Sequence, residues 1–311
     1  MAPSFEGMEG MEGMEGMVGI AAGFASGAGS FFPDRIDLPF VTVEYQPGLP
    51  IAKQRIDIPA FPYRNWDGTW YALLVLTQFV GLATGWDQLG PQILPPWAPT
   101  GDWDSKVPVP PNPESAYDMV QGELDGLVVA AQDERADALG EILAQSTQFG
   151  TYFLDLLTAT NGYPATAKML TIANVVGGFC AMFYKGKYQR PRASMLCPAL
   201  LPPIPVPGHA SFPSGHSTQA HLMALVMSDV LAGQPQLPSM ANDMQALADR
   251  IARNREIAGL HYPSDTDGGV ALAKLINPLL KKPLPPLPNG TPNPTPTWYN
   301  QALALAQAEW A

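Results

Sequence analysis

The stretch Pro213-Ser-Gly-His216 stands between two others, Lys185-Gly-Lys-Tyr-Gln-Arg-Pro-Arg192 and Arg255-Glu-Ile-Ala-Gly-Leu-His261-Tyr-Pro-Ser-Asp265. Together they bring fixed cations, a turn of small residues where a helix is expected to begin, and two histidines. The whole chain has 17 lysines and arginines and a net charge of -11. Seven of these cations fall in or beside the two outer stretches: Lys185, Lys187, Arg190, Arg192, Arg250, Arg253 and Arg255. In an acidic protein, such clustering favours a built site for a tetrahedral oxyanion over a solvated basic face.

Each stretch supplies groups that suit a phosphate-like anion. At a helix start, Ser214 and Gly215 expose a hydroxyl and backbone N–H groups at the positive end of the helix dipole. Lys185 supplies a point charge, whereas Arg192 and Arg255 can each bind two oxygens of one anion. We therefore expect these residues to surround a single anion.

The two histidines suit acid–base and nucleophilic chemistry. His261 and Asp265 lie four residues apart, so the carboxylate can accept from Nδ1–H and leave Nε2 free as a nucleophile or ligand. His216, on another element, is then expected to be the acid or base on the opposite side of the anion. Taken singly, each piece has a plain alternative, because Ser-Gly-His is usually a helix cap and a His–Asp pair usually lies on the surface.

The amino-acid composition limits the classes of protein to which this chain can belong. A hydrophobic content of 46% with 14% charged residues predicts a globular body, and the acidic balance argues against nucleic acid as a partner. Cys180 and Cys197 fit no metal spacing and are expected to be free thiols in a reducing compartment. The first basic residue is Arg35, so a secretory signal is not expected.

Membrane insertion is not expected from hydropathy. The best candidates, between Asp67 and Asp87 and between Lys168 and Lys185, are interrupted by polar residues or are short, which favours buried core helices. The predicted localisation is therefore cytoplasmic or otherwise soluble. The predicted partners are small-molecule anion substrates, and the sequence leaves open whether the chain forms a homo-oligomer.

The chain divides into four parts. Residues 1–30, with Glu-Gly-Met repeated over 6–17, are expected to form a flexible low-complexity arm. Residues 31–112 form an N-terminal extension, irregular or with a small β-hairpin around 36–60, that ends in a proline-rich connector. Residues 113–280 are predicted as the helical catalytic domain, and 281–311 as a proline-rich tail with a short C-terminal helix. Strand signals are nearly absent beyond residue 60, so the fold class is an all-α bundle.

Helices are predicted near 165–189, from Pro213 to about 232, and near 238–259. The segment before them carries an apolar stripe at helical spacing that we expect to face the core: Leu139, Ile142, Leu143, Phe149, Phe153, Leu156 and Leu157.

The order and spacing of the three stretches resemble the tripartite signature shared by type 2 phosphatidic acid phosphatases, bacterial nonspecific acid phosphatases and vanadium-dependent haloperoxidases. The resemblance covers about residues 180–270. It implies a helical bundle in which His261 bonds covalently to phosphorus or vanadium, His216 is the acid–base group and Asp265 orients His261. It also implies that five residues hold the equatorial oxygens of phosphate or vanadate: Lys185, Arg192, Ser214, Gly215 and Arg255.

The sequence departs from the signature at two places. Ala193 stands where proline usually follows the first arginine, and an alternative register through Arg190 would put Phe183 in the place of the lysine. The serine that commonly precedes the second arginine is Asn254, which can still donate and accept hydrogen bonds. We therefore keep the register of Lys185 and Arg192.

His209 favours one branch of the resemblance. Haloperoxidases carry histidine or phenylalanine at this place beside the vanadate, and histidine accompanies bromide oxidation, so His209 is predicted to tune the halide. The plain alternative is a loop histidine that caps a backbone carbonyl. We therefore expect a vanadium-dependent haloperoxidase with vanadate as cofactor. The alternatives are a soluble acid phosphatase that needs no cofactor and a non-catalytic anion-binding or scaffold protein.

Overall fold

The computed structural model describes residues 66–104, 115–157, 163–234 and 237–311. Over these ranges the chain forms helices and no strand, which confirms the predicted all-α class. The hairpin expected around 36–60 and the Glu-Gly-Met arm lie outside the described residues. The α-helices are α2 Gly68–Leu82, α3 Gly90–Ile93, α4 Ala116–Asp133, α5 Arg135–Leu156, α6 Pro164–Tyr188, α7 Ala193–Leu196, α8 Gly215–Val230, α9 Leu237–Ile257, α10 Pro263–Leu280 and α11 Trp298–Ala308, with 3₁₀ turns η3 Trp86–Gln88 and η4 Pro198–Leu200.

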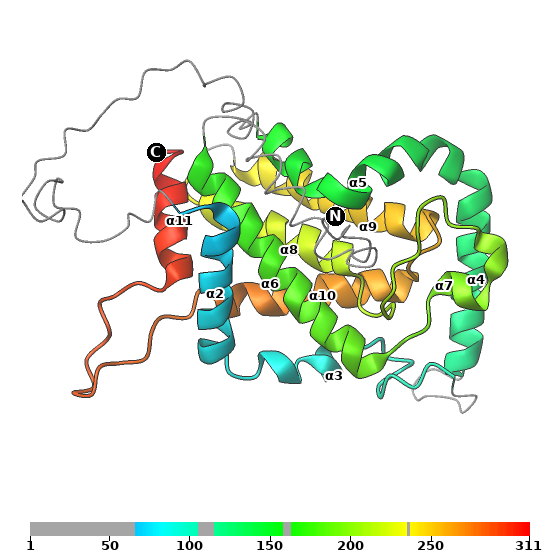
Figure 1. The fold of residues 1–311 in the computed structure, drawn as a ribbon, viewed down its shortest axis with the longest axis horizontal. Coiled ribbons are helices and arrows are strands. Elements are labelled where there is room, and N and C mark those ends of the chain that lie inside the picture. Colours follow the sequence, from blue (N-terminus) through cyan, green and yellow to red (C-terminus); the bar gives the residue numbers. More distant parts are fainter. Residues whose placement is uncertain (1–65, 105–114, 158–162, 235–236) are drawn as a thin grey trace, which may run out of the picture.

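Helices α6 and α8 form the centre of the bundle. Helix α6 packs against α8, α2 and the C-terminal helix α11, while α8 also packs against α9 and α10 (Figure 1). Gly177 of α6 permits the close crossing of the two central helices, since a Cβ there would lie 3.3 Å from the Cα of Gln219. The predicted helices 165–189 and 238–259 are thus found at almost the expected bounds.

Two consecutive glycines seat α10 against the start of α8. A Cβ on Gly269 would lie 2.7 Å from the Cβ of Ser217 and 2.9 Å from the carbonyl oxygen of Ser214. A Cβ on Gly268 would lie 2.4 Å from the ring of Phe212. Close-packed interiors do not tolerate such contacts, so larger residues here would push α10 away. This packing is what brings the third sequence stretch next to the second.

The apolar stripe predicted along 139–157 is only partly buried. Ile142, Phe149 and Phe153 are fully buried, and Leu154 and Leu157 join them in the core. The expectation was wrong for Leu139, Leu143 and Leu156, which are exposed by 38%, 49% and 39%. The reason is that α5 lies at the edge of the bundle, where it contacts α8 and α9 along one side.

The expectation of a cytoplasmic or otherwise soluble protein is overturned by α6. The segment Pro164–Leu196 is, by length and composition, long and apolar enough to cross a membrane, with a mean hydropathy of 1.4 in its 18-residue window. Within the described chain, 78% of that window is buried inside the protein, so the same helix also forms the core of the bundle.

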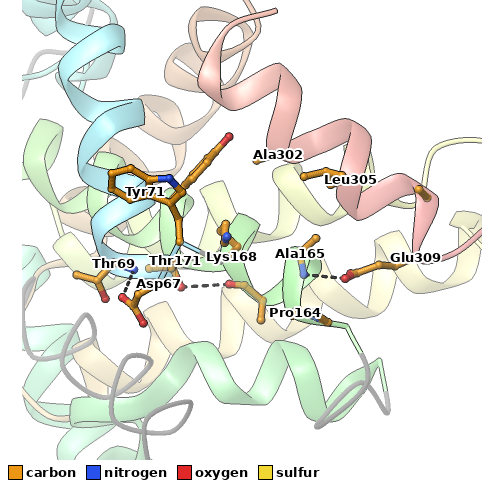
Figure 2. A pocket seen from close by; sticks show the side chains of 14 residues that line it. Asp67, Thr69, Tyr71, Pro164, Ala165, Lys168, Thr171, Ala302, Leu305 and Glu309 are labelled. Carbon is orange, nitrogen blue, oxygen red and sulfur yellow. Dashed lines mark hydrogen bonds between the residues drawn. The ribbon is translucent and has the colours of Figure 1, made fainter. Parts of the chain in front are cut away.

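A pocket of about 540 Å³ lies between α2, α6 and α11, away from the three sequence stretches (Figure 2). It is lined by apolar side chains together with Lys168, Asp67 and Glu309. Lys168 lies about 17 residues before Lys185 on α6, a separation of roughly 25 Å along the helix. The pocket contains none of the predicted site residues.

Glu309 fastens the C-terminal segment to the start of α6. Its carboxylate accepts hydrogen bonds from the backbone N–H groups of Ala165 at 2.7 Å and Thr166 at 2.8 Å, so a residue distant in sequence caps this helix (Figure 2). We predict that Glu309→Ala lowers the free energy of unfolding by about 1–2 kcal/mol, because loss of a helix cap typically costs that much. Denaturant unfolding measures the change.

The matched control is Glu134→Ala, which removes an exposed carboxylate paired with Arg253. Exposed ion pairs contribute little, so this variant should lose less than about 0.5 kcal/mol. Equal losses in the two variants would contradict the capping role of Glu309.

Candidate active site

The N-terminus of α8 lies directly against the start of α10. Ser214 caps α8, with its Oγ accepting from the N–H of Ser217 at 3.3 Å. The N–H of Ser214 donates to the carbonyl oxygen of Asp265 at 2.9 Å. The first helical hydrogen bond runs from Thr218 to Ser214, so the N–H groups of Gly215 and His216 precede the helical ladder. The second and third stretches therefore meet at a helix N-terminus suited to an anion.

The three predicted cations converge on this point from different elements. Lys185, near the end of α6, donates to the carbonyl oxygens of Ala210 at 2.9 Å and Ser211 at 2.8 Å. Arg255, in the last turn of α9, donates to the carbonyl oxygen of Ile142 at 2.8 Å. Both side chains are buried and these partners are neutral carbonyls, so the positive charge is not cancelled by them.

Arg192 is brought back toward α8 by the sharp end of α6. Gln189 ends the helix in the left-handed conformation, with φ 47°, and turns the chain. The guanidinium of Arg192 then lies between two histidines, with NH1 3.1 Å from His261 Nε2 and NH2 3.0 Å from His209 Nδ1. Arg192 is buried, so the chosen register puts it inside the site.

The hydrogen bonds of His261 fix its tautomer. A guanidinium only donates, so Nε2 must accept from Arg192 and the ring proton lies on Nδ1. Nδ1 lies 3.1 Å from Oδ2 of Asp265, the arrangement expected from their spacing. Burial, followed by the charge of Arg192, holds the pKa of His261 well below its usual value. The ring is therefore neutral near pH 7, with the lone pair of Nε2 facing the cations.

His216 has a different environment. Its Nε2 lies 3.2 Å from the carbonyl oxygen of Gln145, its ring packs against Phe149, and its Nδ1 is buried without a hydrogen-bond partner among the described residues. Burial and the charge of Arg255 hold the pKa of His216 well below its usual value. The ring is oriented by a carbonyl oxygen rather than a carboxylate, and Nδ1 is the nitrogen left to exchange a proton.

Asn254 supports this arrangement from α9. Its amide donates to Oε1 of Gln145 at 2.8 Å and to Glu141 at 3.0 Å. The asparagine that replaces the usual serine therefore anchors the residue whose carbonyl holds His216.

His209 lies on the other side of Arg192. Its Nδ1 lies 3.0 Å from NH2 of Arg192 and 3.1 Å from the carbonyl oxygen of Ala210, and its Nε2 is buried without a hydrogen-bond partner among the described residues. Burial, with the charges of Lys185 and Arg192, lowers the pKa of His209 to about 3. His209 is thus a neutral histidine within the site. His221, one turn beyond His216, instead packs in α8 between the carbonyl oxygen of Ser217 and Asp249.

Sequence reasoning missed Arg190 and Glu123. Arg190 was considered only as an alternative register of the first stretch, yet its NH1 lies 2.7 Å from Oδ1 of Asp265 and its NH2 lies 2.7 Å from Oε2 of Glu123. Glu123 belongs to α4, where no motif marks it. The one available signal was the repeated arginine in Arg190-Pro-Arg192, which spacing alone could not interpret.

No family model matches the sequence. Among curated proteins, decaprenylphosphoryl-5-phosphoribose phosphatase of Mycobacterium tuberculosis, in two strains, is 35% identical over 83 residues. That alignment covers 27% of this chain and 42% of the relative, so the chain spans less than half the length of these relatives. Among solved structures, a transmembrane PAP2 type phosphatidylglycerolphosphate phosphatase from Bacillus subtilis aligns with a TM-score of 0.32 and 15% identity, over 68% of this chain and 94% of that chain.

Over the described residues the bundle presents a buried histidine nitrogen beside Arg192, close to a helix N-terminus. The ordered tripartite signature resembles that of type 2 phosphatidic acid phosphatases and vanadium-dependent haloperoxidases, and the local similarity over 83 residues is to a phosphatase.

The predicted haloperoxidase activity was wrong. The site would suit any tetrahedral oxyanion, so its geometry does not select vanadate, and the curated relatives that match are phosphatases. The expectations of a vanadate cofactor and of halide tuning by His209 depended on the haloperoxidase interpretation, and we do not retain them.

Three buried neutral histidines should make the fold sensitive to acid. The pKa values of His209, His216 and His261 are lowered in the folded state, so below about pH 6.5 only the unfolded chain takes up these protons. Stability is then present above that pH and lost as the pH falls. From about pH 7 to about pH 5.5 we predict that the free energy of unfolding falls by about 1 kcal/mol for each histidine.

Urea unfolding at the two pH values measures the effect. Asp265 is ionised in both states over this window, so it does not contribute. His209→Gln removes one titrating ring and should reduce the fall by about a third. A fall that is unchanged in His209→Gln would contradict the assignment of a neutral buried His209.

Proposed function

We propose that the protein is a phosphatase that hydrolyses phosphate monoesters through a phosphohistidine at His261. The observation that carries the proposal is the orientation of this ring, whose Nδ1–H points at Asp265 and whose Nε2 points at Arg192. A nucleophilic histidine needs this tautomer, because only an unprotonated nitrogen can attack phosphorus. The similarity to a phosphatase over 83 residues supports the same reaction class.

Substrate binding brings a phosphoryl group whose negative charge is complementary to the three cations. The phosphoryl oxygens would lie among Lys185, Arg192 and Arg255, with the N–H groups at the start of α8 and the hydroxyl of Ser214 completing the set. In this state NH1 of Arg192 exchanges its contact with Nε2 for one with a phosphoryl oxygen. That exchange frees the lone pair of the nucleophile as the substrate arrives.

The first chemical step transfers the phosphoryl group to His261. Nε2 forms a bond to phosphorus while the bond to the ester oxygen breaks, and the leaving oxygen takes the electron pair and a proton from Nδ1 of His216. Asp265 stabilises the positive charge that the phosphorylated ring acquires. The phosphate dianion offsets the cations near His216, which raises the pKa of that ring and allows it to carry the proton.

The second step releases phosphate. Water attacks phosphorus, Nδ1 of His216 accepts one proton of the water, and the bond between Nε2 and phosphorus breaks with its electron pair returning to His261. His216 is then protonated, and it passes this proton to the departing phosphate or to solvent as the phosphate leaves, so both rings regain the states that they have in the free protein.

The division of roles between the histidines predicts a kinetic difference on p-nitrophenyl phosphate. Its phenolate leaves without needing a proton, so His216→Ala should still form the phosphoenzyme but hydrolyse it about 10²–10⁴-fold more slowly. A stopped-flow trace should then show a burst of about one p-nitrophenolate per chain followed by slow turnover. His261→Ala should show neither burst nor turnover.

The protein for this assay is the full chain in detergent, with His221→Gln as the control histidine variant outside the site. A burst in His261→Ala, or full steady-state turnover in His216→Ala, would overturn the assignment. Wild-type protein that hydrolyses no phosphate monoester would overturn the proposed function itself.

A further inference from the structure

We propose that Arg190 is a positioning residue that fixes the carboxylate of Asp265, and through it the orientation of the His261 ring, while Glu123 of α4 holds Arg190 in place. This inference rests on the proposed function of the same site and extends it to a residue outside the three anion-binding cations. It also gives α4, which carries no motif, a part in the chemistry.

The two oxygens of Asp265 are divided between two tasks. Oδ1 accepts from NH1 of Arg190 at 2.7 Å, whereas Oδ2 faces Nδ1 of His261 at 3.1 Å and accepts from Ser211 at 2.5 Å. With Oδ1 held by a charge-assisted hydrogen bond, the carboxylate plane cannot rotate away from His261. The orientation of the nucleophile therefore depends on Arg190.

Arg190 is itself held by hydrogen bonds at NH1 and NH2 and by aromatic rings. NH1 also donates to Oγ of Ser264 at 2.7 Å, and NH2 donates to Glu123 at 2.7 Å. The guanidinium lies 3.6 Å from the ring centre of Tyr262 and 4.4 Å from that of Trp103, and the side chain is fully buried. A planar fork clamped between aromatic rings has one available orientation, and lysine could not reproduce it.

Glu123 connects the side chain of Arg190 to the start of α10. Its Oε1 accepts from the N–H of Ser264 at 2.7 Å, and its Oε2 accepts from Arg190 and from the Ser264 hydroxyl at 2.9 Å. Glu123 therefore caps the helix that carries Asp265 and pairs with the cation that holds Asp265. A shift of α4 would move both contacts together.

The charge of Arg190 also decides the ionisation of Asp265. Burial alone would raise the pKa of this carboxyl, but Arg190 first and the hydrogen bond of His261 second hold it well below its usual range. Removal of the guanidinium leaves burial as the larger effect, so the pKa rises and a protonated Asp265 no longer stabilises a positive ring. The charged or titratable groups around Asp265 and His261 are Arg190, Glu123, Tyr262, Arg192 and Lys185.

The test compares Arg190→Met, Arg190→Lys and the control Arg253→Met, which also removes an arginine with two carboxylate partners but none at His261. The first readout is the nitrogen-15 spectrum of the imidazoles, which is tractable because the chain has 4 histidines. Wild type and Arg253→Met should show His261 as the Nδ1–H tautomer with the same Nδ1 resonance. Arg190→Met should move the Nδ1 resonance of His261, because the hydrogen bond to Asp265 changes while Arg192 still donates to Nε2.

The second readout is the pH dependence of turnover. In Arg190→Met we expect kcat to fall about 10²-fold with KM within about threefold, and the acidic limb to move upward by at least about one pH unit. Arg190→Lys keeps the positive charge but loses the planar guanidinium. The acidic limb of its pH profile should therefore stay in place, while kcat falls about tenfold. A merely structural role would lower the melting temperature without moving the acidic limb or the Nδ1 resonance of His261.

A folded Arg190→Met with a wild-type Nδ1 resonance, acidic limb and kcat would overturn the inference. If that variant does not fold, Arg190→Lys decides, and wild-type kcat in it would be the overturning result. If wild type hydrolyses no phosphate ester, the proposed function fails, but the imidazole spectra still decide the role of Arg190. The two failures are therefore distinguishable.

Discussion

The buried carboxylate of Asp265 is the point on which the other parts of the site depend. Its side chain receives hydrogen bonds from Arg190, Ser211 and the N–H of Tyr262, and it faces Nδ1 of His261. Its backbone oxygen receives the N–H of Ser214. One residue thus joins His261, the proposed nucleophile, to the helix start that would bind the anion. An ionised carboxylate in the interior costs several kcal/mol unless it is paired, which is why a fully buried arginine accompanies it.

The distribution of charge explains why an anion would bind at a buried site. Arg190 lies between two carboxylates, and Lys185 and Arg255 each donate to backbone carbonyls. Burial first, and then the charge of Arg192 at His261 and of Arg255 at His216, lower the pKa values of these two histidines. A phosphoryl group brings negative charge, and its binding would raise the pKa of His216 again. The empty and the occupied site are thus expected to differ in proton affinity.

Helix packing sets the distances on which this chemistry depends. Gly268 and Gly269 let α10 approach the start of α8, and Gly177 lets α6 cross α8 closely. Lys185 and the central pair of helices are therefore fixed by the same contacts that form the core. The C-terminal helix α11 contributes from a distance, because Glu309 caps the far end of α6. Precision in the site is a consequence of close packing throughout the bundle.

The sequence by itself determined the all-α class and the bounds of α6 and α9, because helical periodicity expresses short-range preferences. It also indicated the pairing of His261 with Asp265, because the two residues lie four apart across the start of α10. Only the tertiary structure decided that Gln145 orients His216 through a carbonyl oxygen, and that Glu123 and Arg190 hold Asp265. It also decided that Leu139 and Leu143 face outward. These contacts join residues far apart in the chain, and burial there follows from which helices lie side by side, which no local pattern of residues encodes.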